Sequence, residues 1–90
     1  MTDLRNLRGR REMIEAILLA VENAEQVMRI CSTAAAGAAD EALADAFGIS
    51  DLQAQAVLDM QIRRFTPERA AAVRAELAEV NQRIRDLEGR

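Results

Sequence analysis

The side chains that offer chemistry in this 90-residue sequence are carboxylates, arginines and a single cysteine. Histidine and tyrosine are absent and every basic residue is an arginine, so the common general bases, Schiff-base formers and phenolic nucleophiles are missing. Cys31 has no second cysteine to pair with, and metal sites of the cysteine–histidine kind are excluded. We therefore expect no catalytic residue, no cofactor and no metal, and we expect Cys31 to be a small buried residue.

Four carboxylates near the middle of the chain raise the question of a hard-cation site: Asp40, Glu41, Asp45 and Asp51. Their spacing does not match a calcium-binding loop. Helix capping and solubility explain these residues better.

Two groups of arginines offer contacts to DNA or to an acidic partner. Arg63, Arg64 and Arg69 form one group, and the other lies near the start of the chain: Arg5, Arg8, Arg10 and Arg11. Solvated arginines at helix ends are the more ordinary explanation for both groups. A net charge of −3 is too acidic for a DNA-binding module acting alone, so we expect no direct sequence-specific DNA binding. The charge is also uneven, because residues 12–60 hold nine acids against the single Arg29 while both ends are basic.

The elements that position these residues are all predicted to be helices, in one domain. Alanine is abundant, proline occurs once and no β-branched run indicates a strand. The predicted helices span about residues 3–31, 40–47, 51–65 and 67–88. No apolar run approaches the roughly 18 residues of a membrane span, and the first residues have no secretion signal, so a cytoplasmic protein without membrane contact is expected.

The predicted central helix, about residues 51–65, has the strongest local signals in the chain. Gly48 is expected to be a left-handed cap of the preceding helix. Ser50 and Gln53 form a capping box at the start of the new helix. On a helical wheel one apolar stripe holds Ala54, Leu58, Ile62 and Phe65, and a second holds Leu52, Ala56, Val57 and Met60. Two stripes predict a helix covered on both sides, and the second stripe is our candidate dimer interface, with burial in the chain's own core as the alternative.

The last helix has the spacing of a coiled-coil seam, preceded by a Thr66 cap and Pro67 at the first helical position. Antiparallel pairing with the first helix predicts a two-helix stalk of residues 1–21 and 67–90, and a helical globule of residues 22–66. The predicted seam consists of Leu4, Leu7, Ile14, Leu18, Val73, Leu77, Val80, Ile84 and Leu87.

The run FGISDLQAQAVLDMQIRRFT, residues 47–66, resembles the exit-gate segment of the A subunit of bacterial DNA gyrase and topoisomerase IV. That family has a phenylalanine-glycine-leucine-serine turn, a helix with Q-A-Q-A-I-L-D-M, and then arginine-arginine-leucine-threonine. MIEAILLAVENAEQVM at 13–28 and RAAAVRAELAEVNQRIRDLE at 69–88 are similar to the helices that lead into and out of the gate. Gly9 departs from the family pattern, as does Glu12, where the family commonly has histidine.

The resemblance implies a dimerisation gate through which transported DNA leaves the enzyme, and no catalysis by this segment alone. In the family, cleavage depends on a tyrosine in a separate domain. The chain is then either a gate domain of a larger enzyme or a free-standing homologue that forms homodimers and associates with the gyrase A subunit; its abbreviated stalk and Gly9 favour the second. No small-molecule ligand is expected.

Two rival hypotheses stay open at this level. A small all-helical enzyme of the chorismate mutase type has a similar length and also dimerises, but its site needs lysine and arginine directed into the helical core. A generic helical adaptor that merely inherited this fold is the other.

Overall fold

The computed structural model describes residues 2–89, in which five α-helices and one 3₁₀ turn follow one another and no strand occurs. The all-α prediction is confirmed. The helices are α1 (Thr2–Glu22), α2 (Ala24–Thr33), α3 (Ala39–Phe47), α4 (Asp51–Leu58) and α5 (Pro67–Glu88), with the 3₁₀ turn η1 (Ile62–Phe65) between the last two. None of these helices is long and apolar enough to cross a bilayer.

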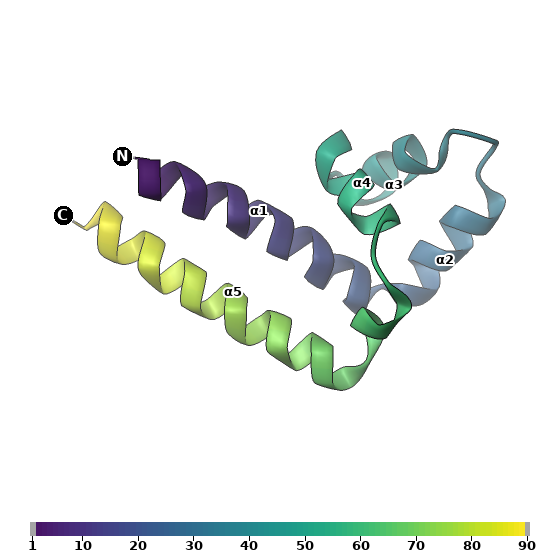
Figure 1. Ribbon diagram of the computed structural model, residues 1–90. Helices are drawn as coiled ribbons and strands as arrows, with labels where there is room; N and C mark the ends of the chain where they lie inside the picture. The colour runs from purple at the N-terminus through teal and green to yellow at the C-terminus, as the bar shows by residue number, and fades with distance from the viewer. Residues whose placement is uncertain (1, 90) are drawn as a thin grey trace.

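Helices α1 and α5 lie side by side and antiparallel along the length of the molecule, whose extents are 47 × 27 × 17 Å (Figure 1). Their seam is a cluster in which Leu7, Ile14, Val80 and Ile84 are buried. The other members are half-buried around it: Leu4, Val73, Leu77 and Leu87. Leu18 is half-buried as well. The stalk (the paired α1 and α5) therefore has an apolar core of its own.

Three exposed ion pairs border the stalk within residues 2–89: Arg8–Glu88, Arg10–Glu76 and Arg74–Glu22. Each joins α1 to α5, and each side chain is 40% or more exposed. Exposed pairs of this kind contribute roughly 0–1 kcal/mol, so the apolar seam holds the two helices together and the ion pairs favour its register.

The globule, which is the packed unit of α2, α3, α4 and η1, has a second core. Its buried residues are Ala16, Ala20, Val27, Leu43, Ala54 and Val57. The first two come from α1, which therefore serves both cores, and α4 packs against the side of α1. Because alanine has only a methyl group, Ala16, Ala20 and Ala54 allow these two helices to approach closely. Cys31 is half-buried against this core.

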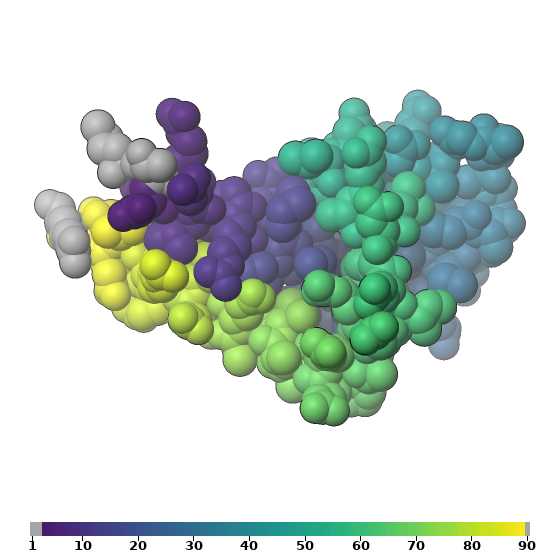
Figure 2. All heavy atoms as spheres, in the orientation of Figure 1, coloured from purple at the N-terminus to yellow at the C-terminus, as the bar shows by residue number. Residues whose placement is uncertain are grey.

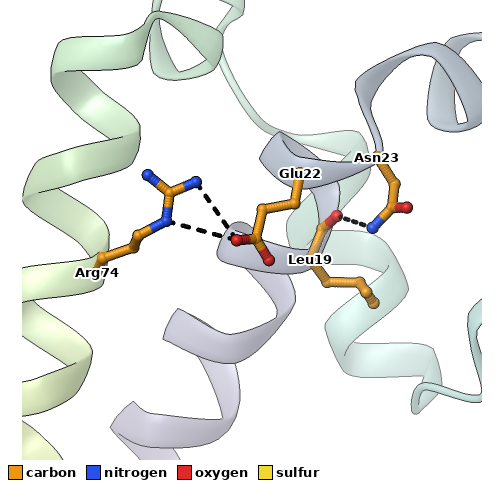
Figure 3. Close-up of polar contacts among 4 residues, drawn as sticks. All are labelled: Leu19, Glu22, Asn23 and Arg74. Atoms are coloured by element: carbon orange, nitrogen blue, oxygen red, sulfur yellow. Dashed lines mark hydrogen bonds and ion pairs between the residues drawn. The ribbon is translucent and has the colours of Figure 1, made fainter.

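The prediction of one continuous first helix over residues 3–31 is wrong, because the helix breaks at Asn23. The Asn23 side chain donates from Nδ2 to the Leu19 carbonyl at 2.8 Å, and its backbone N–H donates to the same carbonyl at 3.1 Å (Figure 3). Asparagine competes in this way for backbone groups and is a poor residue for a helix interior. With φ −127° and ψ 38°, Asn23 turns the chain so that Val27 on α2 reaches the globule core.

The prediction of a central helix reaching residue 65 is also wrong. Helix α4 ends at Leu58, and Asp59 follows at φ −87° and ψ 0°. Gln61 is extended before η1 begins, so the chain changes direction between α4 and η1. The stripes of a continuous helical wheel therefore do not describe this segment, whereas the predicted short helix before it and the last helix are confirmed as α3 and α5.

Candidate functional site

Helix α4 begins at a well-defined point because three residues before and within it fix the backbone. Gly48 is left-handed, at φ 64°, and ends α3 as predicted. The Ser50 hydroxyl accepts a hydrogen bond from the Gln53 backbone N–H at 3.1 Å. The Gln53 side chain accepts one from the Ser50 backbone N–H at 3.0 Å, so the predicted capping box is confirmed.

One face of α4 is held against α1. The amide of Gln53 donates from Nε2 to the backbone carbonyl of Glu12 at 2.9 Å, and Ala54 and Val57 are buried in the globule core. A single glutamine therefore caps its own helix and also docks that helix on α1.

The opposite face of α4 has no cover within the described chain. We call it the α4 outer face, and its exposed residues are Asp51, Leu52, Gln55, Leu58 and Asp59. Leu52 is 66% exposed and Leu58 is 40% exposed. In Figure 2 the α4–η1 segment lies on the side of the molecule that faces the viewer, and the stalk extends away from it to the left. The face thus carries two leucines and two carboxylates, and we call Asp51 and Asp59, which begin and end this stretch of the chain, its acidic rim.

The η1 turn, which follows α4 in the chain after residues 59–61, presents a basic surface. Ile62 is 76% exposed, and Arg63 and Arg64 are also exposed. Phe65 packs against the globule core and fixes the turn, and the Thr66 hydroxyl accepts from the Arg69 backbone N–H at 3.4 Å to start α5. Among residues 2–89, neither Arg63 and Arg64 nor Asp51 and Asp59 take part in an ion pair.

The four predicted interface residues do not share one surface. Leu52 is exposed, Ala56 is half-buried, and Val57 is 6% exposed in the globule core. Met60 is half-buried and packs against the same core. Of the four, only Leu52 lies open to a partner, and its place in an interface stays a prediction.

Leu58 and Ile62 are exposed residues that the helical wheel places on the stripe of Ala54 and Phe65, and not on that of Leu52. Their exposure follows from the end of α4 at Leu58 and the extended Gln61 after it. The sequence signal for this break is Asp59 in the Asp59-Met60-Gln61 run, because aspartate is unfavourable inside a helix.

The remaining charged groups show no other site in the part of the chain that the structure describes. Arg8 and Arg10 pair with glutamates of α5, and Arg5 is exposed. No group of three or more cysteine or carboxylate residues among residues 2–89 is arranged to hold a metal ion. The Asp40 carboxylate instead accepts from the Glu41 backbone N–H at 2.9 Å.

The paired helices, the globule and the α4 outer face together define an all-helical module with an uncovered apolar surface. The model of the family of DNA gyrase and topoisomerase IV A subunits matches residues 1–90. The chain belongs to that family, so the predicted resemblance to the gyrase A family is confirmed.

Relatives of known name agree with this assignment. The DNA gyrase A subunit of Synechocystis sp. is 33% identical over 87 residues, which are 96% of this chain and 10% of that protein. The gyrase A subunits of Campylobacter fetus and Leptospira biflexa serovar Patoc are 31% and 33% identical over 87 residues, again 96% of this chain and 10% of each relative. The chain thus spans about a tenth of the length of the curated relatives it matches.

Proposed function

We propose that this chain is a non-catalytic dimerisation module equivalent to the exit gate of the gyrase A family, and that its α4 outer face meets a second copy. The observation that carries the proposal is the 66% exposure of Leu52, on a helix whose other face is fixed to the chain's own core. An exposed leucine alone is unremarkable in a soluble protein. Here Leu58 shares the face and Ile62 follows it, within the segment most similar to the family's gate.

A small contact suits the role of a gate, which must hold and then part. A standard interface removes roughly 800 Å² from each partner. That would be about one-eighth of the 6146 Å² surface of this chain. A twofold axis would make each copy contribute the same surface, of which the α4 outer face is one part.

The partner tested first is a second copy, and the gyrase A subunit follows because this chain belongs to its family. The chain has no tyrosine, so we assign it no part in DNA cleavage. An association with gyrase would place its function in the cytoplasm.

The experiment is the solution mass by light scattering over roughly 1 to 300 μM protein, a range suited to micromolar dissociation constants. Wild type should form a dimer, and Leu52→Glu should shift it to a folded monomer. Glutamate near the start of α4 suits the helix dipole, so this change should not unfold the helix. Met28→Glu is the matched control, because Met28 is 57% exposed on α2 and should leave the dimer intact.

Three results bear on the proposal. A wild-type chain that stays monomeric throughout the range would refute it, and so would a Leu52→Glu variant that dimerises like wild type. Retention of this chain on the immobilised gyrase A subunit, lost in Leu52→Glu and kept in Met28→Glu, would support the second partner.

A further inference from the structure

We propose that the dimer is held by a reciprocal charge contact, in which Arg63 and Arg64 of each copy dock on the acidic rim of the other copy's α4 outer face. This inference rests on the proposed dimerisation and names the segment of the second copy that contacts the α4 outer face. The counter-charge comes from η1 and not from α4.

The acidic rim argues against the simplest arrangement, in which two α4 outer faces stack directly on each other. Such a stack would bring Asp51 and Asp59 of one copy toward Asp51 and Asp59 of the other. Like charges across an interface are unfavourable, and the cost rises as water is excluded. The leucines between these aspartates can be covered only if cations arrive with the covering surface.

The η1 turn offers two such cations beside an exposed apolar side chain. Arg63 and Arg64 are exposed and take part in none of the ion pairs among residues 2–89. They accompany Ile62, which is 76% exposed, so the turn offers one apolar and two basic side chains to a face that offers leucines and aspartates. Phe65 anchors the turn in the core, which lowers the entropy lost when the arginines are fixed by a partner.

Twofold symmetry makes the contact occur twice. If the turn of one copy lies on the α4 outer face of the other, the symmetry axis requires the converse contact as well. Each copy then contributes both the cations and the carboxylates, so that Arg63, Arg64, Asp51 and Asp59 all meet opposite charges.

A nucleic-acid duplex fits the arginines less well. Asp51 and Asp59 lie close by in the sequence, and residues 12–60 carry nine acids against one arginine, which repel phosphate. A second copy provides the acidic surface that complements these arginines.

The test uses two charge-reversal variants of the whole chain, Arg63→Glu/Arg64→Glu and Asp51→Arg/Asp59→Arg. Each should self-associate roughly tenfold more weakly than wild type or worse, because each places like charges across both contacts. An equimolar mixture of the two should form a heterodimer, because each contact in the mixed pair again joins opposite charges. Raising NaCl from about 50 to about 500 mM should weaken the wild-type dimer, since salt screens exposed ion pairs.

The control is Arg5→Glu/Arg83→Glu, which makes the same change of net charge as Arg63→Glu/Arg64→Glu at exposed stalk positions and should leave dimerisation unchanged. Circular dichroism confirms that every variant is folded. Analytical ultracentrifugation of labelled chains measures the homodimers and the heterodimer.

The outcomes separate this inference from the proposed function. A wild-type monomer would refute dimerisation itself. A dimer that ignores salt and both reversals, or a mixture that fails to restore association, would overturn the charge contact while dimerisation stands. Retention of wild type on a mixed-sequence DNA duplex, lost in Arg63→Glu/Arg64→Glu without any loss of dimerisation, would also overturn it by assigning the arginines to nucleic acid.

Discussion

The double role of Gln53 leads to a graded prediction about stability. Its Oε1 accepts from the Ser50 backbone N–H at 3.0 Å, and its Nε2 donates to the Glu12 carbonyl at 2.9 Å. Gln53→Glu keeps a cap acceptor and removes only the donor to α1, whereas Gln53→Ala removes both. Ser50→Ala removes only the cap hydroxyl. The three variants therefore separate capping of α4 from its docking on α1.

A net hydrogen bond contributes about 1 kcal/mol to folding, and loss of a cap costs about the same. Gln53→Ala should therefore lower the free energy of unfolding by about 2 kcal/mol, and Ser50→Ala by about 1 kcal/mol. Gln53→Glu should also cost about 1 kcal/mol, reduced somewhat by the favourable position of a carboxylate at a helix N-terminus. In a domain of this size 1 kcal/mol corresponds to a change of roughly 4–8 °C in Tm.

The assay is thermal and urea denaturation followed by circular dichroism at one fixed protein concentration, because dimerisation makes Tm depend on concentration. The reasoning requires that Gln53→Ala be the least stable of the three. If Gln53→Glu is as stable as wild type, the bond to Glu12 contributes nothing and α4 is held only by its apolar contacts.

Three further substitutions test helix α1 and the globule core. Gly9→Ala should raise the free energy of unfolding by about 0.5–1 kcal/mol, because Gly9 lies inside α1 and an added Cβ meets nothing within 4 Å; an unchanged or lower Tm would contradict this. Leu43→Ala should lower the free energy of unfolding by about 2–5 kcal/mol, because Leu43 is 0% exposed at the centre of the globule. A loss below about 1 kcal/mol in urea denaturation, or one no larger than that of the exposed Leu52→Ala, would count against that packing. Ala20→Leu should lower the free energy of unfolding by roughly 1–3 kcal/mol, because it overfills the contact of α1 with the globule. Amide hydrogen exchange should then become faster in α4 than in the outer half of the stalk, and equal exchange in both would contradict this.

Local chemistry makes much of this fold predictable from the sequence. The cap at Gly48, the capping box of Ser50 with Gln53, and the start of α5 at Thr66 and Pro67 each depend on neighbouring backbone groups. The length of α5 and its pairing with α1 follow from the spacing of apolar residues, which a long helix displays without interruption.

The two wrong predictions concern places where the chain changes direction inside an apolar run. At Asn23 the wheel pattern continues across the break, where the Asn23 side chain bonds to the Leu19 carbonyl. At Asp59 the apolar residues continue to Phe65, so a helical pattern persists in the sequence after α4 has ended. Tertiary packing decides both cases, because Val27 and Phe65 reach the globule core only when the helices stop.

The candidate site is less predictable for the same reason. The sequence identifies α4 as a helix with two apolar faces, and Leu52 on the outer one. The exposure of Leu58 and Ile62 depends on the turn after Asp59, which a helical wheel does not contain. The sequence contains the acidic rim and the two arginines, but only the structure shows that none of them takes part in an ion pair within residues 2–89.

The antiparallel stalk places the beginning of α1 and the end of α5 next to each other, at the opposite end of the molecule from the globule (Figure 1). Fluorophores, affinity tags or surface-coupling groups attached there would stand clear of the α4 outer face. A donor on one copy and an acceptor on another would then report opening and closing of the pair by energy transfer, without touching the surface whose behaviour is being measured.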